Sequence, residues 1–509
     1  MTDFAIELIG ICKSFGPVAA NRDVEMKVAK GSIHGIIGEN GAGKSTLMSI
    51  LYGYYQADSG TIRVGGRDTR IRNSQEAIRL GIGMVHQHFM LVDTFTVLEN
   101  IVLGAEGGIF LKRGLSQARE HLKQLNQEYG LDVDPDAIVG KLGVGLQQRV
   151  EILKALYRGA DVLILDEPTA VLTPQEADHL FRILRTLKEQ GKTVILITHK
   201  LREVLDITDN VSVMRAGQMV GNVRTCDVDK AALADLMVGR KVNLQVEKLS
   251  REPGEVVLSV KDLHLKDHRG VGLLKGLNFE VRAGEIVGIA GVAGNGQSEL
   301  LEVLAGMTEA TSGEIKFKGQ DLVRTKYRQP KAAALRKLGI AHVPEDRSRE
   351  GLVKAFTTYE NTILGYQCDS QFCNGLLYKR SHLVSHANAL IQQFDIRPDN
   401  PLMRVGLMSG GNQQKVVLAR EIHANPELLL IGQPTRGVDI GAIEFIHRRL
   451  VELRDAGKAL LLVSVELEEI MALSDRILVM SGGEISGEVV GKDATASELG
   501  LLMGGGEIH

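Results

Sequence analysis

The chain has 509 residues, 44% of them hydrophobic and 24% charged, and a formal net charge of −3. This composition is typical of a water-soluble globular protein, and the length favours two domains of about 250 residues or a finer division. The near-neutral charge argues against a nucleic-acid partner, and no apolar run approaches the roughly 20 residues of a membrane-spanning helix. The amino terminus does not resemble a signal peptide, and the four cysteines are too scattered for a zinc site. We therefore expect a cytosolic protein with reduced cysteines.

Strand and helix patterns alternate along the first half of the chain. Apolar and polar residues alternate over Ile6–Ile9, which is typical of a half-buried strand. The runs Val162–Leu165 and Val194–Ile197 are wholly apolar and each follows a helical pattern, as buried parallel strands do. The expected fold class is therefore α/β, with a parallel sheet flanked by helices.

A glycine-rich segment follows the predicted strand Gly35–Ile37. The segment consists of Gly38, Glu39, Asn40, Gly41, Ala42, Gly43, Lys44 and Ser45, and Thr46 comes next. Its glycines let the backbone curl so that amide hydrogens converge on phosphate oxygens, and the positive end of the following helix adds to the attraction. Lys44 would bridge the β- and γ-phosphates, and the Ser45 hydroxyl would help to hold magnesium. The segment therefore predicts a phosphate-binding loop and not an ordinary turn.

Two acidic residues follow the next buried strand. Asp166 and Glu167 come directly after Val162–Leu165, at the strand end where open α/β sheets bind ligands. Asp166 would hold magnesium through water, and Glu167 would act as the general base towards the attacking water. His199 ends the following strand. A lone histidine is more often structural, but the order of loop, carboxylates and histidine favours a functional interpretation.

The second half of the chain repeats the first. Gly291–Ser298 corresponds to the phosphate loop, with Gln297 in place of Lys44. The offset between these two residues also relates Ser59 to Ser312, each of which precedes a glycine. We predict two domains, at residues 4–240 and 256–505, joined by a polar linker at residues 241–255.

Nearly the whole chain, in both halves, resembles the ABC ATPases. The resemblance implies ATP and Mg²⁺ as cofactors, and in each half a parallel-sheet core with an antiparallel β edge and a helical subdomain. It also implies that Phe15 stacks on adenine, that Gln87 contacts magnesium and the attacking water, and that His199 contacts the γ-phosphate. The family's Leu-Ser-Gly-Gly-Gln signature has a counterpart in each half. The first carries Gly143 in place of the serine, and the second retains all three residues, Ser409, Gly410 and Gly411.

The second half has lost the charged groups of this chemistry. Gln297, Glu345, Gly432, Gln433 and Val465 replace Lys44, Gln87, Asp166, Glu167 and His199 in that order, while Ser298 matches Ser45. Electrostatic stabilisation supplies most of the rate in phosphoryl transfer, so the second half should not hydrolyse ATP by itself.

The resemblance further implies that the two halves pair head to tail within the chain. The working site would then combine the residues of the first half with Ser409, Gly410, Gly411 and Asp439. The other site would combine the altered residues of the second half with Gly143 and with Thr173, which stands where an aspartate is expected. Every departure falls in one composite site, which predicts one working and one silent site.

Tandem ABC proteins without membrane spans fall into several classes. Translation factors typically have a long charged linker and two intact sites, excision-repair ATPases have zinc-binding cysteines, and iron–sulfur ribosome recycling factors are rich in amino-terminal cysteines. None of these features is present here. The remaining class is the ATPase subunit of sugar and nucleoside importers.

Three segments, His86–Val92, Gly291–Leu300 and Gln433–Ala442, resemble the nucleoside-uptake branch of that class. Importers of monosaccharides such as ribose or galactose remain the alternative. The resemblance implies two transmembrane permease subunits and an extracytoplasmic solute-binding protein or lipoprotein as partners, no nucleic acid, and a peripheral location at the cytoplasmic face of the inner membrane. Thr96–Asn100 and Thr357–Asn361 would lie near the permeases, although helix capping alone would explain these residues.

Overall fold

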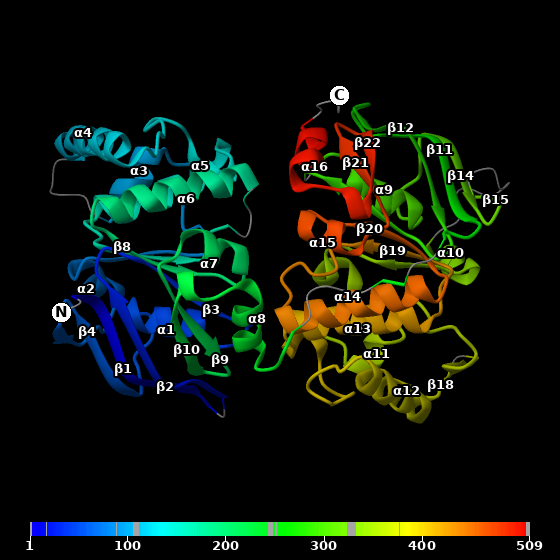
Figure 1. The fold of residues 1–509 in the computed structure, drawn as a ribbon, viewed down its shortest axis with the longest axis horizontal. Helices are drawn as coiled ribbons and strands as arrows, with labels where there is room; N and C mark the ends of the chain where they lie inside the picture. The colour runs from blue at the N-terminus through cyan, green and yellow to red at the C-terminus, as the bar shows by residue number, and fades with distance from the viewer. Residues whose placement is uncertain are drawn as a thin grey trace. The chain divides into compact units, whose positions relative to one another are not determined.

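The computed structural model describes residues 3–16, 18–87, 89–104, 111–169, 172, 174–242, 248–249, 252–292, 294–322, 332–375 and 377–504. The chain divides into two compact units, Met1–Val242 and Asn243–His509, and each is described by itself (Figure 1). Within the described residues, no helix combines the length and the apolar character needed to cross a membrane.

The first unit alternates strands and helices along its length. Its elements are β1 (Phe4–Phe15), β2 (Val18–Ala29), β3 (Ile33–Gly38), α1 (Lys44–Leu51), β4 (Ser59–Val64), β5 (Arg67–Thr69), α2 (Ser74–Arg79), β6 (Ile82–Val85), α3 (Val97–Val102), α4 (Leu111–Tyr129), α5 (Val144–Tyr157), β7 (Val162–Asp166), α6 (Pro174–Glu189), β8 (Thr193–Ile197), α7 (Leu201–Ile207), β9 (Asn210–Arg215), β10 (Gln218–Arg224) and α8 (Lys230–Val238).

The second unit repeats this order, with a short hairpin, β17–β18, added within its helical region. Its elements are β11 (Val256–Lys266), β12 (Gly272–Arg282), β13 (Ile286–Gly291), α9 (Gln297–Leu304), β14 (Ser312–Phe317), β15 (Gln320–Asp321), α10 (Ala332–Leu338), β16 (Ile340–Val343), α11 (Thr358–Asn361), β17 (Cys373–Asn374), β18 (Leu377–Tyr378), α12 (Arg380–Gln393), α13 (Gly410–His423), β19 (Leu428–Gly432), α14 (Ile440–Asp455), β20 (Ala459–Val463), α15 (Leu467–Leu473), β21 (Arg476–Ser481), β22 (Glu484–Val490) and α16 (Ala496–Met503).

Each unit contains a six-stranded sheet and a four-stranded antiparallel sheet. In the first unit the orders are β10-β9-β3-β8-β7-β6, parallel except for β10, and β2-β1-β4-β5. The second unit has β16-β19-β20-β13-β21-β22 and β12-β11-β14-β15. Helices α3, α4 and α5 pack against one another and form the helical region of the first unit. The predicted α/β class, with an antiparallel edge and a helical subdomain, is confirmed.

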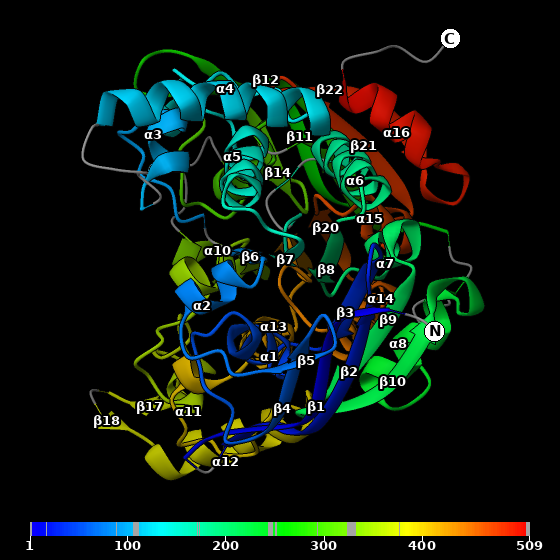
Figure 2. The ribbon, with the colours of Figure 1, turned by 90° about the vertical axis from the view of Figure 1, so that its left-hand side faces the viewer.

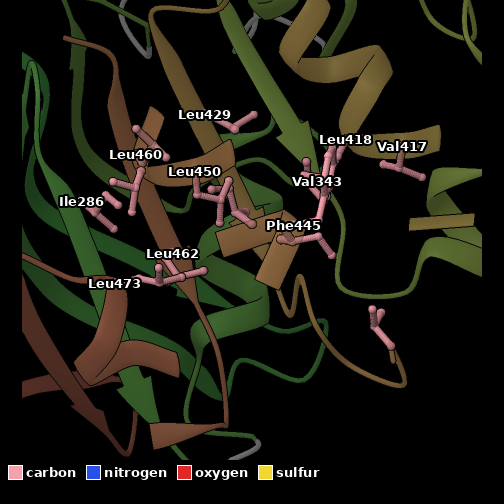
Figure 3. Packing of buried hydrophobic residues seen from close by; sticks show 14 of the residues in the cluster. Ile286, Val343, Val417, Leu418, Leu429, Phe445, Leu450, Leu460, Leu462 and Leu473 are labelled. Carbon is pink, nitrogen blue, oxygen red and sulfur yellow. The ribbon is translucent and has the colours of Figure 1, made fainter. Parts of the chain in front are cut away.

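The apolar runs in the sequence become the central strands because helices cover the sheet. Every residue of β7, β8, β19 and β20 is buried. In the second unit, Leu429, Leu460 and Leu462 from the strands pack with Leu450 of α14 and Leu473 of α15 (Figure 3). Burial of this apolar surface stabilises each core and leaves the polar residues at the strand ends.

Neighbouring strands bring separate parts of the sequence together. In the first unit β3 lies beside β8, and β8 lies beside β7 (Figure 2). These strands are parallel, so their carboxyl ends share one edge of the sheet. The residues that follow them, including Lys44, Asp166 and His199, are therefore neighbours in space.

A glycine required near the start of one strand recurs in both units. Gly60 has φ +105° and Gly313 has φ +118°, values that residues with a side chain rarely adopt. A Cβ atom would lie 2.5 Å from the Gly10 carbonyl oxygen in one unit and 2.6 Å from the Asp262 carbonyl oxygen in the other. The same need for glycine at equivalent positions supports the description of the chain as one domain repeated.

Candidate functional site

The phosphate loop of the first unit connects β3 to α1. Gly41 and Gly43 have φ values of +82° and +99°, so the backbone adopts the left-handed region at both positions. The Lys44 side chain is only 6% exposed, and its ammonium donates to the carbonyl oxygens of Gly38, at 2.7 Å, and Glu39, at 3.1 Å. Lys44 therefore lies back over its own loop, where it places a positive charge beside the amino terminus of α1.

The remaining residues predicted for the loop differ in how far they are exposed to solvent. Ala42 is buried, Glu39, Gly43 and Thr46 are partly exposed, and Asn40, Gly41 and Ser45 are exposed.

A hydroxyl–carboxylate pair lies beside the loop. The Ser45 hydroxyl is hydrogen-bonded to the Asp166 carboxylate at the end of β7. Asp166 is 9% exposed, and burial raises the pKa of its carboxyl, against the opposing effects of the Ser45 hydrogen bond and the charge of Lys44. A buried carboxylate with a neighbouring hydroxyl is a donor set that suits Mg²⁺.

The Glu167 carboxylate contacts side chains from two other segments of the first unit. Its Oε1 lies 2.8 Å from His199 Nδ1, and its Oε2 accepts a hydrogen bond from Gln87 Nε2 at 3.2 Å. A carboxylate only accepts hydrogen bonds, so Nδ1 of His199 carries a proton in this arrangement. The His199 hydrogen bond, against the effect of burial, lowers the pKa of Glu167 and keeps it ionised. Glu167 also has φ +47°, which turns its side chain out of the strand direction.

Phe15 ends β1 and is 43% exposed. Tyr55 supports the ring edge-on, with ring centroids 5.1 Å apart, and the Lys13 ammonium lies 5.5 Å from the Phe15 centroid. The ring is accessible to a planar ligand, and its stacking on adenine remains a prediction.

The loop of the second unit keeps the backbone of the first without its charge. Gly294 and Gly296 have φ values of +89° and +101°. The Gln297 side chain is 6% exposed, and its Nε2 donates to the Val292 carbonyl oxygen at 3.1 Å, as Lys44 does to the carbonyl oxygen of Glu39. The Gln297 amide thus makes the hydrogen bond that the Lys44 ammonium makes in the first unit. It carries no positive charge, so it does not attract phosphate as the lysine does.

The base and histidine positions of the second unit are neutral. Gln433 has φ +47°, the value of Glu167, and its Oε1 accepts from the Val465 backbone N–H at 3.2 Å. Val465 is 45% exposed, and its side chain has no group that can bond a phosphate oxygen. Gly432, at the end of β19, has no side chain where Asp166 stands in the first unit.

The Glu345 carboxylate accepts a hydrogen bond from the Ser298 hydroxyl at 2.7 Å. Burial raises the pKa of Glu345. The second unit therefore retains one hydroxyl–carboxylate pair.

The signature residues begin equivalent helices in the two units. Ser409 caps α13, since its Oγ accepts from the Asn412 backbone N–H at 3.4 Å, whereas Gly143 precedes α5 with no side-chain cap. A Cβ on Gly411 would lie 3.5 Å from the carboxylate of Asp439, which precedes α14. Ser409, Gly410, Gly411 and Asp439 thus form one cluster in the second unit. Thr173 lies outside the described residues.

Arg347 joins this cluster, and sequence reasoning missed it. Its guanidinium donates to the carbonyl oxygens of Arg436, at 2.6 Å, and Gly437, at 3.3 Å, and a Cβ on Gly410 would lie 2.5 Å from it. The residue therefore ties the signature to the loop that leads into Asp439. The one available signal was an arginine two residues after Glu345, where the first half has Phe89.

A lysine in a phosphate loop, a serine–aspartate pair and a glutamate held by histidine and glutamine, all on a parallel sheet with a helical subdomain, define an ATP-binding cassette ATPase. A family model for "ABC transporter" matches residues 21–170 and 274–436. The chain belongs to this family of ATP-hydrolysing transport proteins, and it carries the domain twice.

Similar proteins extend over the full length of the chain. A nucleoside import ATP-binding protein, NupA, of Lactococcus lactis subsp. cremoris is 47% identical over 99% of both chains. A guanosine import ATP-binding protein, NupO, of Bacillus subtilis is 47% identical over 99% of this chain and 98% of that one. A ribose import ATP-binding protein, RbsA 1, of Rubrobacter xylanophilus is 41% identical over 99% and 98%.

A solved structure also shares the fold. The archaeal ribosome recycling factor aABCE1, in complex with the ribosomal stalk protein aP1, aligns with a TM-score of 0.60 over 92% of this chain and 87% of its own. At 21% identity this similarity shows the fold alone.

Proposed function

We propose that this protein is the ATP-hydrolysing subunit of an importer for nucleosides. The observation that carries the proposal is the asymmetry of the two units: Lys44, Asp166, Glu167 and His199 come together in the first, and their counterparts in the second are neutral. The solute rests on the two nucleoside and guanosine import proteins, each 47% identical to the chain over nearly its whole length.

The side chains of the first unit supply each part of ATP hydrolysis. Lys44 would bind the β- and γ-phosphates, and Glu167, ionised because its pKa is lowered, would accept a proton from the attacking water. Gln87 would orient that water, and His199 would contact a γ-phosphate oxygen. Ser45, Gln87 and Asp166 would hold magnesium, which neutralises charge that develops on the phosphate oxygens.

The two units pair head to tail within the chain in this proposal. Ser409, Gly410 and Gly411, with Asp439, would complete the working site, and Gly143 would face the silent one. Support comes from the partition of the departures and from the cluster that these four residues form in the second unit. The proposed domains are residues 4–240 and 256–505, and the boundary between the compact units, at Val242, falls within the proposed linker at 241–255.

The partners in this proposal are two permease subunits in the membrane and an extracytoplasmic solute-binding protein. The chain would lie at the cytoplasmic face of the membrane, and nucleic acid has no part in the assembly. The similarity to import ATP-binding proteins supports such an assembly in general terms.

A monosaccharide importer is the second candidate. The similarity to the ribose import ATP-binding protein of Rubrobacter xylanophilus, at 41% identity, supports it.

The decisive experiment purifies the intact membrane complex and identifies the ligand of the solute-binding protein that comes with it. Uptake into vesicles would then be measured with labelled guanosine and labelled ribose. ATP-dependent uptake of guanosine alone is the expected result, and uptake of ribose alone would transfer the protein to the second candidate.

A further inference from the structure

The β17–β18 hairpin carries two apolar side chains that the second unit leaves uncovered. Cys373 pairs with Tyr378 and Asn374 with Leu377, and Gly375 lies in the turn between the strands with φ +65°. Leu377 is 76% exposed and Tyr378 is 60% exposed, and no large apolar side chain in the described part of the chain is more exposed than Leu377. Neighbouring residues of a strand point to opposite faces, so the hairpin is uncovered on both faces.

The base of this hairpin is fixed to the helical region of the second unit. Phe372, directly before β17, is 3% exposed and packs in a small core with Ile363 and with Leu383 of α12. Its carbonyl oxygen accepts a hydrogen bond from the Lys379 backbone N–H at 3.0 Å, and its ring centroid lies 4.8 Å from that of His386. Figure 2 shows β17 and β18 at the periphery of the second unit. A short element with a fixed base therefore presents an apolar tip to solvent.

Two basic residues follow the tip directly. Lys379 and Arg380 are exposed, and neither forms an ion pair with any residue that the structure describes. The Lys379 ammonium donates to the Ser370 carbonyl oxygen at 2.8 Å, which leaves its charge uncompensated. The sequence has no aspartate or glutamate from Ser370 to Phe394, although the whole chain has 63 acidic residues against 60 lysines and arginines. The hairpin and the start of α12 therefore form a locally cationic surface.

The position of these charges does not stabilise α12. Lys379 precedes the helix, Arg380 is its first residue, and its first turn contains no acidic side chain. The amino end of a helix carries a partial positive charge, so cations placed there are unfavourable. The exposed tip is equally unfavourable in water, because apolar surface gains free energy only when water is removed from it. Both features become favourable at a surface that combines negative charge with an apolar interior.

The first half of the sequence contains a similar string. Residues 375–380 read Gly-Leu-Leu-Tyr-Lys-Arg, and residues 108–113 read Gly-Ile-Phe-Leu-Lys-Arg. The recurrence is one of sequence, since residues 105–110 lie outside the described part of the chain. The second half thus keeps three apolar residues followed by two basic ones, although it has lost the charged groups of catalysis.

We propose that the β17–β18 hairpin and the start of α12 bind the surface of an anionic lipid bilayer. Leu377 and Tyr378 would enter the boundary between headgroups and acyl chains, where such side chains are favoured. Lys379 and Arg380 would attract the lipid phosphates. A bilayer surrounds both faces of an inserted tip, whereas a flat protein surface covers only one. The inference depends neither on the solute nor on ATP hydrolysis, and it shares with the proposed function only the location at a membrane.

A single tryptophan at the tip tests the insertion. The chain has no tryptophan, so Tyr378→Trp introduces one such fluorophore into the full-length protein. Vesicles of equal parts phosphatidylcholine and phosphatidylglycerol should shift its emission to shorter wavelength, because the indole leaves water. Val271→Trp is the matched control. Val271 is 52% exposed in the loop between β11 and β12, and a tryptophan there should show no shift.

Sedimentation with the same vesicles tests the basic residues. Lys379→Gln combined with Arg380→Gln should weaken binding about 30-fold, since each cation at an anionic surface contributes about fivefold. Raised ionic strength should weaken binding of the wild-type chain, because salt screens exposed charges. Lys266→Gln combined with Lys275→Gln removes the same net charge from exposed positions of β11 and β12, and affinity should stay within about twofold.

An unshifted Tyr378→Trp emission in the presence of these vesicles would overturn the inference. Equal vesicle binding by the wild-type chain and the Lys379→Gln, Arg380→Gln variant, with thermal unfolding unaltered, would overturn it too. An emission shift that requires permease subunits in the vesicles would assign the hairpin to a protein contact instead. ATP hydrolysis and solute uptake by the wild-type complex are measured separately, so failure of the lipid contact leaves the proposed function standing, and failure of hydrolysis leaves the lipid contact standing.

Discussion

Lys44 and Gln297 begin equivalent helices, α1 and α9, and both side chains turn back to donate a hydrogen bond to a carbonyl oxygen of their own loop. The backbone of the loop therefore does not depend on the lysine charge, since an amide holds it equally well. The comparison shows that the loop conformation and its positive charge are independent. The second unit keeps the backbone conformation of a phosphate-binding loop although the lysine charge is lost.

The same separation holds at the base. Glu167 and Gln433 share φ +47°, and their backbone N–H groups donate to the strand next to them, at 2.9 Å to Ile197 and 2.8 Å to Val463. The backbone conformation at this position is thus the same in both units. The second unit lacks the base because a carboxylate oxygen of Glu167 is replaced by the amide nitrogen of Gln433.

The largest expected effect on ATP hydrolysis comes from giving the first unit the glutamine that the second unit has at the base position. Glu167→Gln should lower the ATP hydrolysis rate by about 10²–10⁴, because the attacking water loses its base. ATP binding should persist, since Lys44 and Asp166 remain, whereas Lys44→Ala should weaken binding itself. Steady-state hydrolysis and equilibrium nucleotide binding measure the two effects separately. A Glu167→Gln chain that keeps more than a tenth of the wild-type rate would remove Glu167 from the position of dominant base.

The second prediction concerns the two signatures. Ser409→Arg should nearly abolish hydrolysis, although Ser409 belongs to the unit without catalytic groups. An oriented donor to the γ-phosphate contributes roughly 10²–10³ in rate, and a bulky charged residue also blocks closure. Gly143→Arg is the matched change, because both residues immediately precede the signature helices α13 and α5. It should reduce hydrolysis less.

Hydrolysis rates of these two variants at saturating ATP give the comparison. Equal losses, or a larger loss in Gly143→Arg, would show that the working site is not assembled across the two units. Independent units would show no effect of Ser409→Arg at all.

Much of the fold and of the first site could be predicted, because their signals are local. Apolar runs become buried strands wherever helices cover both faces, and the phosphate loop with Lys44, Asp166 and His199 each lie at the end of such a run. Parallel strands share an edge, so residues at their ends meet. These predictions needed only short stretches of sequence and a periodicity.

The contacts of the second site could not be predicted in the same way. Glu345 was read as a lost glutamine and Gly432 as a lost aspartate, because a residue-by-residue comparison treats each position separately. Only the 2.5 Å approach between position 432 and Glu345 shows that one side chain occupies the space of the other. Arg347 was missed for the same reason, since its partners at Arg436 and Gly437 lie on a distant loop.

A third prediction separates capping from partner binding at the helices predicted to face the permeases. Thr96 and Glu99 form a reciprocal capping box at α3, and Thr357 and Glu360 form one at α11. Thr96→Ala and Thr357→Ala should each lower the free energy of unfolding by about 1 kcal/mol. Thr96→Ser and Thr357→Ser are the conservative controls and should restore most of it. Chemical denaturation measures the effect, and a loss of permease binding in vesicles without loss of stability would assign these threonines to the interface instead.

The last and smallest effect is expected from returning the lysine to the second unit. Gln297→Lys places an ammonium where the side chain is 6% exposed, and Val292 offers it the carbonyl that Glu39 offers to Lys44. Affinity for nucleotide in that unit should therefore rise. Hydrolysis there should not begin, because Gln433 cannot accept a proton from water and Val465 makes no contact to the γ-phosphate. Trapped complexes of this variant should accordingly contain no more than one hydrolysed nucleotide per chain. Two hydrolysed nucleotides after this single change would mean that the lysine charge alone separates the two units, and that the neutral residues at the ends of β19 and β20 are not what keeps the second site silent.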